Sequence, residues 1–156
     1  MKTALILVGK TNDIHLQAII SDYAERITHY MPFEIIVIPE LKNTKSLSEE
    51  QQKVREGELI MKQLTAQDTV ILLDERGKQY RSLEFAKWIE KQQLTARRLV
   101  FVIGGPYGFS STIYDRANGK ISLSMMTFSH QLVRTIFTEQ LYRACTIIKG
   151  EPYHHE

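Results

Sequence analysis

The sequence predicts an α/β protein built on a parallel sheet, and two observations carry this prediction. Short apolar runs rich in β-branched residues alternate along the chain with segments of helical periodicity, an order typical of parallel strands joined by helices. The strand runs are continuously apolar, so each strand should be buried on both faces of the sheet. No internal repeat, low-complexity stretch or linker interrupts the 156 residues, and we expect one domain, residues 1–156.

Five strands are expected from the apolar runs. The first three are TALILVG, FEIIVIPE and DTVILLDE, and the fourth and fifth are RRLVFVIGG and ISLS. Each is bounded by polar, glycine or proline residues, which end strands. The expected ranges are 3–9, 33–40, 68–75, 97–105 and 121–124.

Helices are expected at 14–30, from Ser46 or Ser48 to about Leu64, at 82–92, at 110–117 and at about 130–149. The second begins with a capping box, because Glu49 or Gln51 follows a serine by three residues. Thr127 or Ser129 can cap the last helix, and Gly150 and Pro152 end it. Its buried stripe should consist of residues at helical spacing: Val133, Phe137, Leu141, Ala144 and Ile148.

Composition excludes several classes of protein. The apolar run at 4–9 is too short for a signal peptide, and no run approaches the length of a membrane span. The single cysteine, Cys145, excludes an internal disulfide and is expected in the core, and no ligand spacing suggests a metal. We therefore expect a cytoplasmic protein that binds neither membrane nor metal. The net charge of +2 is too small to indicate RNA binding by itself, so any contact with RNA should depend on a local cluster of positive charges.

The stretch FVIGGPYGFS, residues 101–110, ends an expected strand in a glycine-rich loop. A Walker phosphate loop is excluded because Phe109 and Ser110 follow Gly108 in place of Lys and Ser or Thr. A dinucleotide fingerprint fits poorly, because the spacing is Gly-Gly-x-x-Gly and the loop lies late in the chain. Glycines that only permit a tight turn or close packing remain an alternative.

A second loop, in the segment ISLSMMTFSHQLVR at 121–134, follows the last expected strand. The carboxyl ends of parallel strands meet at one edge of a sheet, where open α/β sheets bind ligands. Both loops and the strand end at Leu73 and Asp74 should therefore converge on one site. Packing of Met125 and Met126 in the core is the alternative for this second loop.

Four separated motifs give the chain a family resemblance. Gly-Gly-Pro-x-Gly after an apolar strand is followed by SLSMMTFSHQLVR, EQLYRA and a terminal PYHHE, and MPFEIIVIPE precedes them at 31–40. In this order they resemble the RlmH family, SPOUT-class methyltransferases that modify N3 of a pseudouridine in 23S ribosomal RNA. The similarity runs essentially from end to end.

The resemblance implies the compact SPOUT fold with a C-terminal trefoil knot, which general topology rules would not suggest. It also implies a homodimer with the cofactor pocket near the subunit interface, and S-adenosyl-L-methionine as the cofactor. By similarity, the residues that bind the cofactor are Leu73, Gly105, Leu123, Ser124, Met125, Met126, Thr127 and Phe128.

Methyl transfer to N3 must release a proton, so a general base or a water path is expected. His130 and His154 are candidates because histidine titrates near neutral pH. The resemblance also gives Tyr153 a catalytic place, in a tail that folds over the cofactor pocket. His155 stands where relatives often carry Arg or Lys.

Arg134, Arg143 and His155 are the candidate RNA contacts. Arg143 could instead form a surface pair with Glu139, four residues before it, and Arg134 could contact a partner protomer. The small size and weak charge favour a substrate recognised within the folded ribosome. Two other hypotheses stay open: a non-enzymatic adenine-nucleotide-binding module, and a knotted methyltransferase that acts on transfer RNA.

Overall fold

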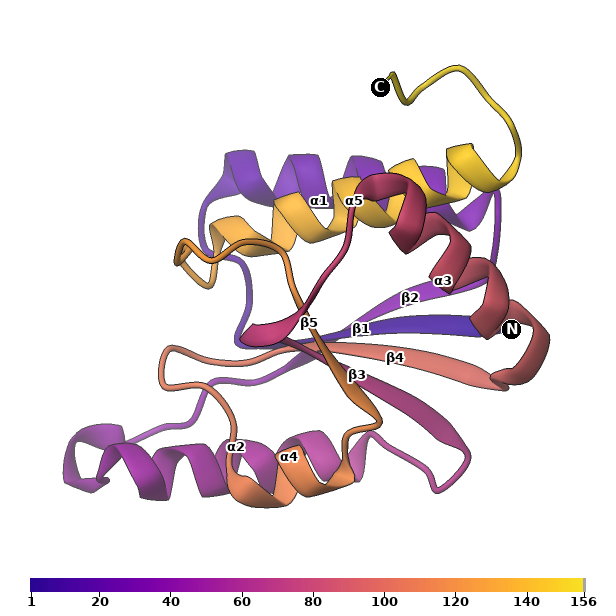
Figure 1. The fold of residues 1–156 in the computed structure, drawn as a ribbon. Helices are drawn as coiled ribbons and strands as arrows, with labels where there is room; N and C mark the ends of the chain where they lie inside the picture. The colour runs from indigo at the N-terminus through magenta and orange to yellow at the C-terminus, as the bar shows by residue number, and fades with distance from the viewer. Residues whose placement is uncertain (156) are drawn as a thin grey trace.

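A computed structural model describes residues 1–155 and shows a five-stranded sheet between two layers of helices (Figure 1). The strand order is β2-β1-β4-β3-β5, and the neighbouring strands run parallel. The parallel α/β sheet is thereby confirmed, whereas the knot stays a prediction. The strands are β1 (Lys2–Val8), β2 (Phe33–Ile38), β3 (Asp68–Gln79), β4 (Arg98–Ile103) and β5 (Gly119–Ser122).

The helices divide between the two faces of the sheet, as Figure 1 shows. One face carries α1 (Ile14–Thr28), α3 (Ser82–Thr95) and α5 (Leu132–Ile148), and the other carries α2 (Glu49–Lys62) and α4 (Ser111–Arg116). A short 3-10 helix at Thr44–Ser46 precedes α2. Within residues 1–155, none of these helices combines the length and the apolar character needed to cross a bilayer.

Strand β1 shows why the strand runs are continuously apolar. Leu5 and Leu7 pack into the core beneath α1, α3 and α5, whereas Ala4 and Ile6 pack into the core beneath α2 and α4. All four side chains are at most 2% exposed. Successive side chains of a strand point to opposite faces, so a strand between two helical layers needs apolar residues at every position.

The edge of the sheet beside β5 differs from the expected ranges. Strand β3 continues to Gln79, and its register against β5 shifts between Leu73 and Lys78. The irregularity depends on Gly77, because a β-carbon there would lie 2.6 Å from the backbone of Ile121. Strand β5 begins at Gly119 and ends at Ser122, each two residues before the expected range, and the segment 123–131 is a loop.

The helix ends follow local chemistry. Ser48 caps α2 in a capping box with Gln51, as the sequence predicted. Helix α5 begins at Leu132, whose N–H donates to Oγ of Ser129 at 3.0 Å. In the expected buried stripe, Phe137, Leu141 and Ala144 are buried and the first and last members are half-buried, and Cys145 is in the core.

Candidate cofactor and acceptor site

A cavity of about 490 Å³ lies beyond the carboxyl ends of β4 and β5, beside the middle of β3 where its register against β5 shifts. Its wall consists of residues 73–76 of β3, the glycine loop after β4, the loop after β5 and the start of α5. Met125 does not line it and its side chain is 83% exposed, although the sequence assigned it to the cofactor. The other seven predicted cofactor residues do line it: Leu73, Gly105, Leu123, Ser124, Met126, Thr127 and Phe128.

The glycine loop is shaped from beneath by helix α2. A β-carbon on Gly105 would lie 2.8 Å from Oε1 of Glu56, so a larger residue there would have to displace the buried Glu56 carboxyl group. Gly108 has φ +82°, which only glycine adopts readily, and it forms an isolated bridge with Gly105. The loop is therefore a tight reversal resting on a buried carboxyl group, and its outer surface faces the cavity.

The loop after β5 is held by two serine hydroxyls. Ser122 donates to the carbonyl of Ser124 at 2.9 Å, and Oγ of Ser124 accepts from the N–H of Met126 at 3.0 Å. These bonds form a local turn of the kind that serine favours. The Ser124 hydroxyl thus shapes the loop and keeps its own proton for a further acceptor.

Sequence reasoning missed one wall of the cavity, formed by Tyr114, Arg76 and Lys53. The Tyr114 hydroxyl donates to Asp74, which ties α4 to the middle of β3. Burial, followed by this hydrogen bond, raises the pKa of Tyr114 to about 12, so the phenol stays protonated at neutral pH. Asp74 itself was noted in the sequence, but a contact across 40 residues leaves no local signal.

His130 is the only catalytic candidate among the cavity-lining residues. Burial, and then the positive charge of Arg134, lower its pKa below the usual value for histidine. The imidazole is accordingly neutral at pH 7, the form that can accept a proton.

Arg134 has a structural position that the sequence did not reveal. Its side chain is 0% exposed, and its guanidinium donates to the carbonyls of Val8 and Gly9 at 2.8 and 2.9 Å and to the Thr11 hydroxyl at 3.0 Å. These bonds attach α5 to the loop after β1. Because the guanidinium is enclosed by its own chain, we no longer assign Arg134 an RNA contact.

The C-terminal tail packs on α5 and α1, and its described residues, 150–155, do not line this cavity, over which we expected the tail to fold. The Tyr153 hydroxyl donates to Glu139 at 2.9 Å, and its ring packs edge-on against Tyr142, with centroids 4.8 Å apart. In Figure 1 the tail lies above α5, at the opposite end of that helix from the loop that leads into it. Burial and hydrogen bonds to Tyr23 and Glu139 raise the pKa of Tyr153.

Arg143 connects the tail to α5. It forms an ion pair with Glu139 and its guanidinium lies 4.8 Å from the centroid of the Tyr153 ring. Its Nη1 lies 3.0 Å from Nδ1 of His154. A guanidinium can only donate, so Nδ1 accepts and a neutral His154 carries its proton on Nε2. Glu139 therefore holds Arg143 in place, and Arg143 holds the tail. His155 is exposed.

Comparison with known proteins shows the family to which the chain belongs. A family model described as predicted SPOUT methyltransferase matches residues 1–154, and the chain belongs to the SPOUT methyltransferase family. Proteins named ribosomal RNA large subunit methyltransferase H are similar over their full length. Those of Bacteroides fragilis and Phocaeicola vulgatus are each 60% identical to this chain, and that of Flavobacterium johnsoniae is 54% identical, with 100% of both chains covered in all three.

Proposed function

We propose that the protein methylates N3 of a pseudouridine in large-subunit ribosomal RNA with S-adenosyl-L-methionine as the methyl donor. One observation carries the proposal: the loops that a SPOUT resemblance assigns to the cofactor converge on one cavity of about 490 Å³. The full-length similarity to proteins named ribosomal RNA large subunit methyltransferase H supports the substrate.

The residues around the cavity fit the proposed cofactor. Leu73, Leu123 and Phe128 offer apolar surface for an adenine. Glu75 suits the ammonium group of the cofactor, and Lys53 suits its carboxylate. S-adenosyl-L-methionine supplies an electrophilic methyl group on a sulfonium. The chain's own residues then position the acceptor, and positioning is the main requirement of an in-line displacement.

His130 is the group we propose to accept the N3 proton. It lines the cavity, and burial keeps its imidazole neutral at pH 7. A neutral imidazole within reach of the acceptor base can take up its proton as a general base. The raised pKa of Tyr153 suits this residue to stacking or hydrogen bonding rather than to proton removal.

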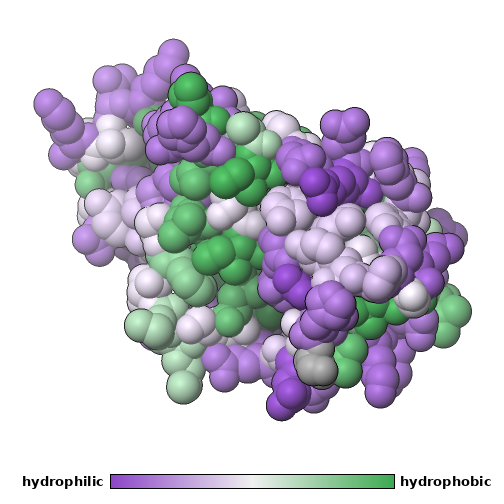
Figure 2. Space-filling model, turned by 90° about the horizontal axis from the view of Figure 1, so that it is seen from above, coloured by the Kyte–Doolittle hydropathy of each residue, from purple (hydrophilic) through white to green (hydrophobic). Residues whose placement is uncertain are grey.

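We further propose that two protomers pair through the face formed by α1 and α5. Figure 2 looks onto this face and shows a band of apolar side chains across it. Ile14, Ile19 and Leu132 are 71%, 44% and 43% exposed there, and apolar patches of this kind mark interfaces.

Such a dimer gives the tail a place in catalysis. The tail follows the C-terminal end of α5, whereas His130 and Val133 of the cavity wall lie at its N-terminal end. A two-fold pairing with the α5 helices antiparallel brings the tail of each protomer to the cavity of its partner. Tyr153 and His154 then serve the acceptor base in trans, and Arg143 and His155 lie close enough to contact RNA phosphates.

The small domain and the net charge of +2 support recognition of the assembled ribosomal subunit, in the cytoplasm, over free RNA.

Calorimetric titration tests the cofactor: S-adenosyl-L-methionine should bind, and NADH and ATP should not. A deletion strain tests the product, because nucleoside mass analysis should find one methylated pseudouridine missing from the large subunit. Loss of a transfer RNA modification instead, or unchanged nucleosides in both RNAs, would contradict the proposal.

A further inference from the structure

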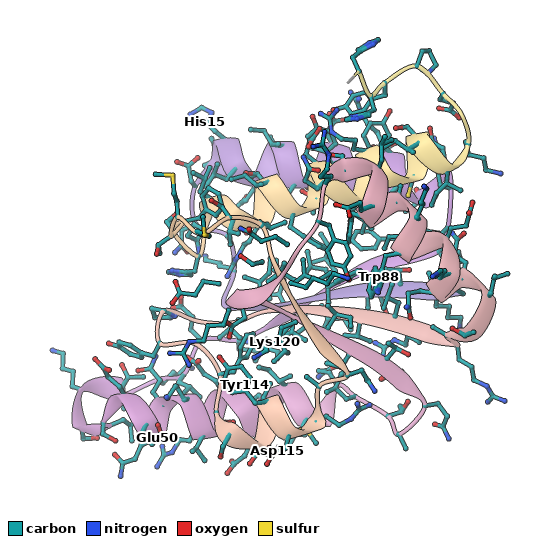
Figure 3. The ribbon with its side chains drawn as sticks, in the orientation of Figure 1. His15, Glu50, Trp88, Tyr114, Asp115 and Lys120 are labelled. Carbon is teal, nitrogen blue, oxygen red and sulfur yellow. The ribbon has the colours of Figure 1, made fainter. Side chains whose placement is uncertain are left out.

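A second cavity of about 300 Å³ adjoins the first along the outer strand of the sheet. Arg76 and Tyr114 line both cavities and so form the wall between them. The remaining lining comes from the end of α4 and the start of β5: Ala117, Asn118, Gly119 and Lys120. In Figure 3, Tyr114 and Lys120 lie close together where α4 meets the edge of the sheet.

The Lys120, Arg76 and Asn118 side chains of this second cavity offer hydrogen-bond donors. Lys120 Nζ lies 5.5 Å from the centroid of the Tyr114 ring. Among residues 1–155, no ion pair or hydrogen bond involves the Arg76 guanidinium. The Asn118 side-chain oxygen is occupied by the N–H of Val70 and by Arg116, which leaves its NH₂ group as a donor.

Nearby carboxylates do not line the second cavity. Asp74 accepts the Tyr114 hydroxyl and the N–H of Arg76, and it lines the first cavity but not the second. Asp115 points away from the sheet on the far side of α4 (Figure 3). Two cations, an amide and no carboxylate form a lining suited to a phosphate group.

Tyr114 adds a fixed aromatic surface. Its hydroxyl bonds to Asp74, and its ring meets Phe109 edge-on, with centroids 5.8 Å apart. The side chain is nevertheless 38% exposed. Aromatic rings held in this way are the surfaces on which unpaired RNA bases stack.

We propose that the second cavity binds a nucleotide that flanks the methylated base, with its phosphate on Lys120 and Arg76 and its base against Tyr114. This assignment rests on the proposed function, since it takes the substrate to be a single-stranded RNA segment. The shared wall of Arg76 and Tyr114 then makes the two cavities neighbouring positions along one strand.

Lys120→Ala is the sharpest test, because Lys120 lines only the second cavity. With large subunits from a strain lacking the enzyme, the variant should raise KM for the subunit about 3- to 10-fold. Its affinity for S-adenosyl-L-methionine should equal that of the wild type. The slope of log(kcat/KM) against log salt should fall by about one, as expected for one lost phosphate contact. Lys120→Arg should retain most of the activity.

Lys87→Ala provides the matched control, because Lys87 is an exposed lysine on α3 outside both cavities. Co-sedimentation of each variant with the subunit gives a readout that does not depend on turnover. If the wild type is active and Lys120→Ala is unchanged in KM, salt slope and subunit binding, the nucleotide site in the second cavity is overturned and the proposed function is not. A wild type that neither binds nor methylates the subunit would overturn the proposed function and this inference together.

Discussion

The carboxyl group of Glu56 lies against Gly105, so that a β-carbon on Gly105 would fall 2.8 and 3.0 Å from its two oxygens. At the other end of the glycine loop, Ser110 packs against Gly57 of α2, where a β-carbon would lie 2.7 Å from Oγ of Ser110. Glu56 and Gly57 are both buried. Helix α2 therefore supports both ends of the glycine loop, and the geometry of the cofactor site depends on a helix that contributes little to its surface.

Gly105→Ala should displace the glycine loop, because its β-carbon would meet Glu56. We expect at least a tenfold loss of affinity for S-adenosyl-L-methionine and a destabilisation of about 1–3 kcal/mol, as for other overpacked sites. The double variant Gly105→Ala with Glu56→Ala should recover part of the affinity. Calorimetry measures both, with Gly119→Ala as a control, whose β-carbon would meet Ile71 at an ordinary 3.4 Å. Failure of the double variant to bind better than Gly105→Ala would show that Glu56 is not the obstacle.

Glu56 should make stability depend on pH. Burial, reinforced by the charge of Glu40, raises its pKa above the usual value of 4.5, although a hydrogen bond from Gln52 opposes the shift. In the window above pH 4.5 the folded state therefore holds more protons than the unfolded state, and its stability falls as pH rises through the folded pKa. Above that pKa the destabilisation is complete.

Glu56→Gln keeps the shape of the side chain and removes its charge. Urea unfolding from pH 4 to pH 8 should show the variant more stable than the wild type at pH 8, with the difference vanishing toward pH 4. A difference that is constant across this range would mean that Glu56 does not titrate in the window its burial predicts.

Arg134→Ala should unfold the protein more readily, because it leaves the carbonyls of Val8 and Gly9 without their donor. We expect a loss of about 2–6 kcal/mol, because each buried carbonyl left without its donor costs about 1–3 kcal/mol. Arg55→Ala, at an exposed position of α2, should change stability by less than about 0.5 kcal/mol. Denaturation with urea compares the two. Wild-type stability in Arg134→Ala combined with weak RNA binding would instead show that Arg134 contacts RNA.

Mixing two inactive variants tests whether the tail of one protomer completes the active site of its partner. Truncation after Pro152 should reduce turnover far more than affinity for S-adenosyl-L-methionine, and Gly105→Val should abolish cofactor binding and leave the dimer intact. An equal mixture of the two variants, unfolded and refolded together, should recover about a quarter of wild-type activity, because half of the dimers contain one complete site. A mixture no more active than its components would place the tail in its own protomer's site.

Much of the fold could be predicted because its signals are local. Continuous apolar runs such as residues 3–9 indicate strands covered on both faces, and the Ser48 capping box marks the start of α2. Most cofactor candidates line one cavity because the carboxyl ends of parallel strands meet at one edge of the sheet.

The unpredicted features depend on contacts between distant segments. Arg134 looks like a surface cation in the sequence, and its burial becomes apparent only when α5 meets the carbonyls after β1. In the sequence, the glycine at position 105 suggests that a ligand approaches the backbone there, whereas in the structure Glu56 of α2 lies where a β-carbon at this position would be. The place of the tail follows from a bond between Tyr153 and Glu139, which the helical pattern of α5 does not signal.

A methyl-transfer assay is the most direct test of the proposed activity on the large ribosomal subunit. Purified protein, labelled S-adenosyl-L-methionine and large subunits from a strain lacking the enzyme are incubated, and the RNA is digested for nucleoside mass analysis. We predict one methyl group per subunit, on N3 of a pseudouridine, with far less incorporation into free ribosomal RNA. No incorporation into the subunit, or a methyl group on another base, would contradict the account.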